Sequence, residues 1–254
     1  MNSLMYKSEY AKMFSSEDEL WWYTALRHTL KYFIKKYAVQ DPYILDAGCG
    51  TGKNIAYLTS LNYKNIQGFD YSADAIAYCQ KRGLNQVKQG NITAISYPDN
   101  TFDVVYCMDV LGSLDVTLAL QAANELYRVL KPGGILICHT AALELFRSQH
   151  DNVANIKLRY NKIQFKALLE SNNAEVLKLS YRVFILSPLV LLFKLAKRIT
   201  GLFKPEGKSA SDQLKFPFAV NWVLLKIQLF ENYLFTKINL PFGSSVFIAV
   251  RKKK

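Results

Sequence analysis

Residues 44–54 read ILDAGCGTGKN, the most informative segment of the chain for its architecture. An apolar run ends in Asp46, and Gly48, Gly50 and Gly52 follow it ahead of a segment with helical spacing. A strand, glycine loop and helix in this order bring bare backbone close to a ligand where doubly wound sheets bind nucleotides. A Cβ atom at these glycines is expected to collide with that ligand. The stretch therefore predicts a nucleotide-binding loop.

The segments around the loop alternate between short apolar runs and helical stretches. The predicted strands cover residues 43–47, 66–69, 86–89, 102–108, 135–140, 175–186 and 244–251, and the predicted helices cover residues 54–60, 73–81, 116–130 and 162–170. Elements that alternate at this spacing predict an α/β fold with a parallel, doubly wound sheet and helices on both faces. The sequence KPGG at residues 131–134 is expected to form a turn without a catalytic role.

An amphipathic helix is predicted ahead of the loop, over residues 16–37. Ser15 and Ser16 are expected to cap it, and the acidic run that follows them suits a first turn. Apolar residues then recur at helical spacing as far as Ile34.

Three kinds of nucleotide-binding loop compete for residues 46–54. A dinucleotide fingerprint, GxGxxG, requires glycine where this chain has Lys53. A P-loop, GxxxxGK[ST], requires glycine at Ala47 and a hydroxyl residue at Asn54. Each motif is matched incompletely, so other segments of the sequence are needed to identify the nucleotide that the loop binds.

Four such blocks follow in order: GFDYS at 68–72, GNIT at 90–93, PDNTFDVV at 98–105 and YRVLKPGG at 127–134. With the glycine loop they make the chain resemble, over residues 41–140, the class I S-adenosylmethionine-dependent methyltransferases. The resemblance is to their type-11 group, which is related to ubiquinone-biosynthesis C-methyltransferases. It implies a Rossmann-like, doubly wound seven-stranded sheet and an enzyme whose methyl donor is S-adenosylmethionine and whose product is S-adenosylhomocysteine.

The resemblance also implies the cofactor-binding residues. Asp70 is expected to accept hydrogen bonds from both ribose hydroxyls, and Tyr71 is expected to lie against the adenine. Asp46 is the candidate for seating the methionine amine, through a water molecule. The full set is Asp46, Gly48, Cys49, Gly50, Gly52, Asp70, Tyr71, Asn91, Ile92 and Met108.

Asn91 departs from the family, which usually has aspartate at this position. The resemblance implies that residue 91 receives the adenine amino group and that the backbone N–H of Ile92 meets a ring nitrogen. An asparagine oxygen can still accept the first bond. Turn formation by Asn91 and helix capping by Asp70 are the alternatives.

The acceptor side of the site is indicated by weaker similarities. Trp21, Trp22 and Tyr23, with Arg27, resemble a segment of some type-11 relatives and suggest a lid over the cofactor and acceptor; core packing is the alternative. His150–Asp151 and Arg159–Tyr160 are also similar to a segment of that subset, which makes His150 the first candidate to contact or deprotonate an acceptor hydroxyl.

Two further positions bear on the chemistry. Relatives tend to show DVLEH where this chain has DVLGS at 109–113, which removes two ionisable groups and leaves Asp109 near the methyl group as the second catalytic candidate. His139 lies in an apolar strand end and is interpreted as a core residue, although strand ends also line clefts. Methyl transfer needs a base only when the nucleophile must lose a proton.

Four scattered cysteines without CxxC spacing predict buried free thiols in a reducing compartment and no metal site. The net charge of +12 is concentrated near the end of the chain. Residues 181–254 hold 13 Lys and Arg against 3 Asp and Glu, which points to an anionic partner surface. A membrane fits this better than nucleic acid does, because no nucleic-acid-binding motif accompanies the charge.

Residues 183–241 are unusually apolar and aromatic, and they are interpreted as an insertion before the last strand. Residues 188–203 predict a cationic amphipathic helix with Lys194, Lys197, Arg198 and Gly201 on one stripe, and residues 219–236 predict a second apolar helix. We expect the insertion to lie on a membrane rather than cross it; packing on the core is the alternative. The predicted division is therefore a helical lid at 1–40, a methyltransferase core at 41–182 and 242–254, and the insertion at 183–241.

Three functions follow for testing. The first is a cytoplasmic methyltransferase, bound peripherally to the inner membrane face, that methylates a hydrophobic or lipid-linked acceptor. The second is a soluble O- or N-methyltransferase for a small molecule. The third is a cofactor-binding scaffold without turnover, which the departures at Asn91 and at Gly112–Ser113 motivate.

Overall fold

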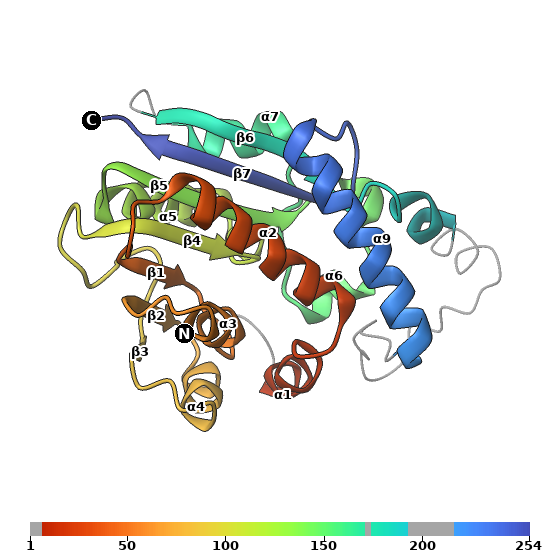
Figure 1. Ribbon diagram of the computed structural model, residues 1–254, viewed down its shortest axis with the longest axis horizontal. Helices are drawn as coiled ribbons and strands as arrows, with labels where there is room; N and C mark the ends of the chain where they lie inside the picture. Colours follow the sequence, from red (N-terminus) through yellow and green to blue (C-terminus); the bar gives the residue numbers. More distant parts are fainter. Residues whose placement is uncertain (1–6, 171–173, 193–215) are drawn as a thin grey trace.

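A computed structural model describes residues 7–170, 174–192 and 216–254 of the chain (Figure 1). The strands are β1 Ile44–Ala47, β2 Ile66–Asp70, β3 Val87–Gln89, β4 Phe102–Met108, β5 Leu130–Ala141, β6 Ala174–Arg182 and β7 Ser245–Lys252. The helices are α1 Lys7–Ser16, α2 Trp21–Tyr37, α3 Lys53–Ser60, α4 Ala73–Lys81, α5 Val116–Val129, α6 Gln149–Val153, α7 Lys162–Leu169 and α9 Phe218–Lys237, with short 3-10 turns at Leu111–Ser113 and Glu144–Phe146.

The strands form one seven-stranded sheet in the order β3-β2-β1-β4-β5-β7-β6. The first five strands in this order pair in parallel, while β7 runs antiparallel to both β5 and β6. The doubly wound α/β prediction is confirmed, with one reversed strand. The carboxyl ends of β1, β2, β4, β5 and β6 consequently meet at one edge of the sheet, and β7 begins at that edge.

Each face of the sheet is covered by its own helices. Helices α5 and α7 pack on one face, where Leu126 and Phe165 join a core cluster with Val105 and Ile248. Helices α2, α3 and α9 pack on the opposite face, in a second cluster with Ile137. In Figure 1, α2 and α9 lie side by side across that face, and Phe33 of α2 contacts Phe235 of α9 with ring centroids 6.0 Å apart.

The leading helix differs from its prediction. Ser15 and Ser16 do not cap it; they end α1, and α2 begins at Trp21. The break has a tertiary cause, because Glu17 turns inward to accept hydrogen bonds from Thr51 Oγ1 and, at 2.8 Å, from Arg82 Nη2. The buried contacts of Glu17 therefore outweigh the capping preference of Ser15 and Ser16.

The second helix predicted for the insertion is present as α9. The cationic stripe at Lys194, Lys197, Arg198 and Gly201 lies outside the described residues; of that predicted helix the structure describes residues 188–192, and these are helical. Among the described residues, none of the helices combines the length and apolar character that crossing a membrane requires. All four cysteines are buried and unpaired, as predicted.

Candidate active site

The glycine loop after β1 adopts a backbone that favours glycine. Gly48, Gly50 and Gly52 have φ angles of 87°, 54° and 83°, in the left-handed region that side chains disfavour. A Cβ on Gly48 would lie 2.3 Å from Val110 Cγ2, and a Cβ on Gly52 would lie 2.5 Å from Leu84 Cδ1. A Cβ at these glycines would therefore already meet protein atoms, and the expected collision with the cofactor stays a prediction.

Asp70 ends β2 and ties the loop to the next strand. Its Oδ2 accepts the backbone N–H of Gly50 and its Oδ1 accepts that of Ser72, both at 2.9 Å. Burial raises the pKa of the Asp70 carboxyl, and these backbone bonds oppose that rise. A carboxylate has about four acceptor sites, so Asp70 retains capacity for the two ribose hydroxyls expected from the sequence.

Asp46, at the carboxyl end of β1, has one satisfied and one unsatisfied oxygen. Tyr106 donates its hydroxyl to Asp46 Oδ2 at 2.8 Å, while Asp46 Oδ1 is buried without a partner in the part of the chain that the structure describes. Burial raises the pKa of this carboxyl well above its ordinary range. A cationic amine at Oδ1 would supply the missing hydrogen bond and charge, so the donor set fits the methionine end of S-adenosylmethionine.

The Asn91 side chain accepts hydrogen bonds within its own turn. Its Oδ1 accepts the backbone N–H of Thr93 at 3.0 Å and the hydroxyl of Thr93 at 2.9 Å, which is the turn geometry considered as the alternative. An adenine contact at this oxygen stays a prediction and requires one of these bonds to be exchanged. Ile92 is buried beside Asn91, and Tyr71 is half-buried after Asp70.

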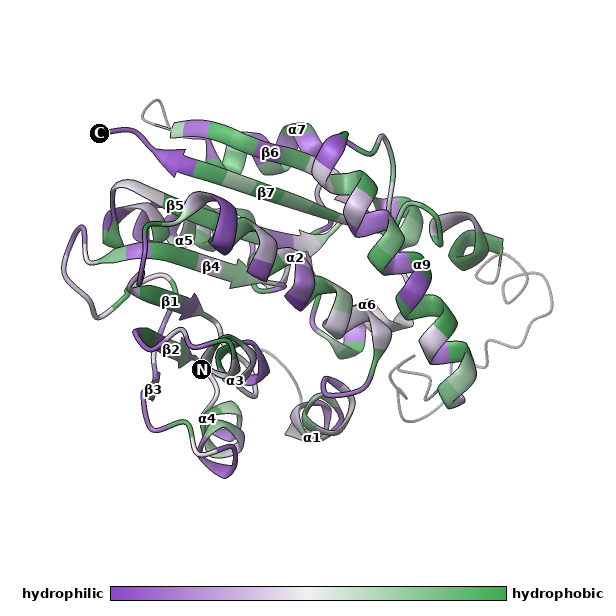
Figure 2. Ribbon diagram, in the orientation of Figure 1, coloured by the Kyte–Doolittle hydropathy of each residue, from purple (hydrophilic) through white to green (hydrophobic). Residues whose placement is uncertain are grey.

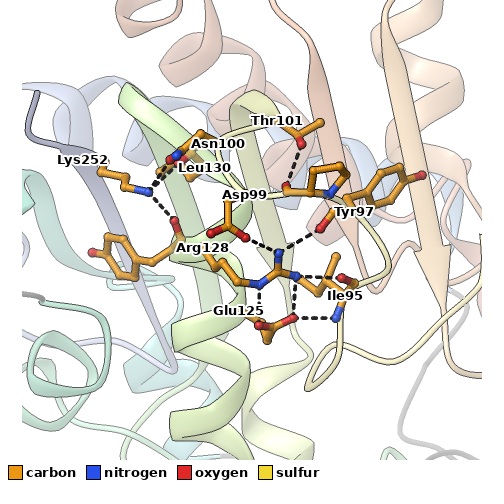
Figure 3. A network of polar contacts seen from close by, with 11 residues as sticks. Ile95, Tyr97, Asp99, Asn100, Thr101, Glu125, Arg128, Leu130 and Lys252 are labelled. Atoms are coloured by element: carbon orange, nitrogen blue, oxygen red, sulfur yellow. Dashed lines mark hydrogen bonds and ion pairs between the residues drawn. The ribbon is translucent and has the colours of Figure 1, made fainter.

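A salt-bridge cluster holds the loop that carries Asn91 (Figure 3). Arg128, at the end of α5, donates to both carboxylate oxygens of Glu125, to Asp99, and to the backbone oxygens of Ile95 and Tyr97, at 2.7–2.9 Å. Glu125 also accepts the backbone N–H of Ile95 at 2.7 Å. The blocks PDNTFDVV and YRVLKPGG are thus linked by structure, and residues 131–134, expected to form a turn, are instead part of β5.

Helix α1 covers the glycine loop from outside. A Cβ on Gly50 would lie 2.8 Å from Met13 Cε. Arg82, just after α4, donates to the backbone oxygen of Thr51 at 3.0 Å and to that of Phe14 at 3.3 Å. Burial raises the pKa of the Glu17 carboxyl, and the hydrogen bonds from Thr51 and Arg82 oppose that rise. The N-terminal segment is therefore anchored on the cofactor loop, where a lid would have to lie.

His139 and Asp109 form a pair at the carboxyl ends of β5 and β4. His139 Nδ1 lies 3.0 Å from Asp109 Oδ1. In a neutral imidazole, Nδ1 would donate to this carboxylate, which can only accept, and Nε2 would keep the lone pair. His139 Nε2 is buried and has no partner among the described residues, and the Trp22 ring lies 5.3 Å from the imidazole. An imidazole oriented by a carboxylate can take a proton from a nucleophile.

This geometry revises the interpretation of His139 as a satisfied core residue. The ring is fully buried, but one nitrogen is unsatisfied. The register of the sheet could have suggested the site, because His139 pairs with Met108, the last residue of β4 and one of the expected cofactor residues. Asp109 has a φ of 61°, which is uncommon outside glycine, and its N–H bonds to the His139 carbonyl at 2.8 Å.

His150 lies on α6, and its side chain is outside the described structure, so its catalytic role stays a prediction. Its neighbour Asp151 is fully buried and accepts two hydrogen bonds from Arg159, at 2.5 Å and 2.8 Å. Arg159 also donates to the Ala142 carbonyl just after β5 at 2.9 Å. This ion pair fixes α6 to the end of β5.

A seven-stranded doubly wound sheet, a left-handed glycine loop after β1 and carboxylates at the ends of β1 and β2 define the class I methyltransferase architecture. Residues 45–138 match the family model described as a methyltransferase domain, and this match supports a class I S-adenosylmethionine-dependent methyltransferase of the type-11 group.

Curated relatives support this assignment, but each matches only part of the chain. The chain is 36% identical over 118 residues to the probable methyltransferase ltbC of Aspergillus luteorubrus, covering 41% of each protein. It is 34% identical over 107 residues to a demethylmenaquinone methyltransferase of Lactiplantibacillus plantarum, covering 39% of this chain and 44% of that protein. The matched region thus spans less than half the length of these curated relatives.

A solved structure extends the likeness to the whole fold. A possible histamine N-methyltransferase of Thermotoga maritima superposes with a TM-score of 0.60 over 97% of this chain and 96% of that chain, at 18% identity. At this identity the likeness concerns architecture alone.

Proposed function

We propose that this chain transfers a methyl group from S-adenosylmethionine to a hydrophobic or lipid-linked acceptor at the cytosolic surface of a membrane, and that the methylated group is a hydroxyl. The observation that carries the proposal is the His139–Asp109 pair with its unsatisfied buried Nε2. When bound, S-adenosylmethionine supplies a methyl group made electrophilic by its sulfonium sulfur.

The residues divide the work between binding and proton transfer. Asp46 and Asp70 would hold the amine and the ribose of the donor, and the Gly48–Gly52 loop would let its backbone approach. Asp109 would keep the proton on His139 Nδ1, so that Nε2 takes the proton of the acceptor hydroxyl as the oxygen is methylated. Trp22 would exclude water above His139.

Support for an acceptor at a membrane comes from the outer face of α9. Phe218, Trp222, Phe230 and Tyr233 are each more than half exposed. Two of these rings lie beside cations: Lys226 Nζ is 5.2 Å from the centroid of Trp222, and Lys237 Nζ is 5.9 Å from that of Tyr233. In Figure 2 apolar and polar residues alternate along α9. Aromatic rings flanked by lysines, in the basic third of the chain, suit an anionic leaflet.

Flotation with vesicles tests the membrane part. Wild-type protein should float with vesicles of anionic phospholipid and should float less with neutral vesicles or at high salt. Trp222→Ser with Phe230→Ser should reduce flotation, whereas Ile163→Ser, an exposed apolar residue on α7, should leave it unchanged. Equal flotation of all variants, or none by the wild type, would contradict membrane binding through α9.

The methyltransferase part is tested separately. Calorimetry should show binding of S-adenosylmethionine, and labelled methyl groups should enter a membrane and lipid extract. Turnover of a water-soluble acceptor without any lipid would favour the soluble enzyme, and binding without turnover would favour the scaffold.

A further inference from the structure

Arg182 is a buried cation at the site edge of the sheet, with its guanidinium carbon 5.8 Å from the centroid of the Phe235 ring. It is the last residue of β6 and is 1% exposed. Its Nη2 donates to Asn232 Oδ1 at 2.9 Å, while Nε and Nη1 have no partner within the described ranges. Burying a guanidinium without hydrogen-bond partners is unfavourable. Such nitrogens indicate a position that a ligand completes.

Glu231 does not neutralise Arg182 by contact. Its two oxygens accept the backbone N–H groups of Val183 and Ile185, at 2.6 Å and 2.8 Å, and the amide of Gln228 at 2.7 Å. Burial lowers the pKa of Arg182 to about 10, with Glu231 and Asp109 opposing that change. The Arg182 side chain therefore remains charged at neutral pH. The main contacts of Glu231 hold the turn that follows Arg182.

Two more buried polar atoms lie around Arg182 without partners in the described structure. Ser245 Oγ is one, and Ser245 pairs in the sheet with Arg182 on one side and with Ala141, two residues beyond His139, on the other. Gln228 Oε1 is the second, one turn of α9 before Glu231 and Asn232. The inward face of α9 is thus polar where its outward face is aromatic.

We propose that Arg182 and Ser245 bind an anionic oxygen group of the methyl acceptor, a carboxylate or a phosphate, while Gln228 Oε1 accepts a hydrogen bond from a hydroxyl beside it. The inference rests on the proposed function and deepens it: the acceptor is an acid or phosphate ester whose methylated oxygen lies near the anion. Arginine suits this role because its planar donors match carboxylate and phosphate oxygens.

Anion binding can be measured without turnover. Wild-type protein with S-adenosylhomocysteine is titrated with inorganic phosphate and with acetate while tryptophan fluorescence is followed, since Trp22 lies against His139. A saturable response is expected in the wild type and in the control Arg251→Met. Arg182→Met should weaken it at least about tenfold, and Arg182→Lys should weaken it less.

Calorimetric binding of S-adenosylhomocysteine verifies that each variant folds; it should be unchanged, because Arg182 is not among the cofactor residues. A wild type without an anion response, or an Arg182→Met response equal to that of the wild type, overturns the inference. Failure of the proposed function looks different: the cofactor does not bind, or no methyl group is transferred, whatever the anion titration gives.

The labelled product supplies a second test. After methyl transfer into a membrane and lipid extract, the product should be retained on an anion-exchange column at neutral pH. Partition into chloroform identifies a lipid headgroup as the source of the anion, and partition into water identifies a free acid or phosphate. A labelled product that passes through the column uncharged overturns the inference.

Discussion

The two halves of the sheet edge satisfy their polar groups differently. Around β1 and β2, Asp46 Oδ1 has no partner in the described residues, but both Asp70 oxygens receive backbone N–H groups, those of Gly50 and Ser72, only 20 and 2 residues away in the sequence. Around β5, β6 and β7, His139, Arg182 and Ser245 keep polar atoms without partners in the described parts of the chain. We interpret the first half as a cradle for the cofactor and propose that the second half binds the acceptor. Substitutions in the two halves should therefore fail in different ways.

The largest effect is expected at His139. His139→Gln removes the proton acceptor and should lower kcat by about 10²- to 10⁴-fold, while cofactor binding stays near the wild-type value. His28→Gln, on an exposed turn of α2, serves as the control. Initial rates with a labelled methyl donor measure the effect. If both histidine variants retain full activity, His139 is not the base.

Asp70→Asn should produce the opposite pattern. Its carboxylate holds the loop and is expected to accept the ribose hydroxyls. Since hydrogen bonds to charged groups contribute about 1.5–3 kcal/mol, the affinity for S-adenosylmethionine should fall about 10- to 100-fold. Asp41→Asn is a matched control, because residue 41 has a φ of 49° that asparagine tolerates. Calorimetry measures both; equal affinities would remove Asp70 from the cofactor site.

Arg128→Met tests the clamp on the loop that carries Asn91. Losing its charged hydrogen bonds should lower the free energy of unfolding by about 1–3 kcal/mol, measured by urea denaturation. Lys166→Met removes an exposed ion pair with Glu170 and should cost less than about 1 kcal/mol. A clamp variant as stable as this control would mean that the network contributes little.

These contrasts explain what the sequence could predict. The glycine loop and the order of the elements follow from short motifs, because their contacts are local, whereas the expected roles of Asp46 and Asp70 come from the family resemblance. The hydrogen bond from Tyr106 to Asp46 joins residues 60 positions apart. The sequence indicates a core position for His139 because an apolar strand end looks the same whether its last polar atom is satisfied or not. Arg182 carries no signal within the predicted strand at 175–186, since its burial depends on α9, 50 residues further along. The break before α2 likewise depends on Glu17 reaching Thr51.

The smallest expected effect concerns pH. The hydrogen bonds from Arg128 lower the pKa of Glu125, so the pair stabilises the fold above the ordinary carboxyl pKa of about 4.3. This contribution, about 0.2–1 kcal/mol, is lost as the pH falls through the lowered folded-state pKa. Urea unfolding at several pH values should show wild type and Glu125→Gln converging at acid pH. A difference that persists unchanged there would contradict this origin.

The proposed reaction is tested by labelled methyl transfer from S-adenosylmethionine into a native membrane and lipid extract, with wild type and Asp109→Asn compared side by side. We expect the wild type to form a labelled product and Asp109→Asn to react at a strongly reduced rate with unchanged cofactor affinity, because His139 loses the carboxylate that orients it. A wild type that binds the cofactor yet labels nothing, or an Asp109→Asn variant that labels at the wild-type rate, would contradict it.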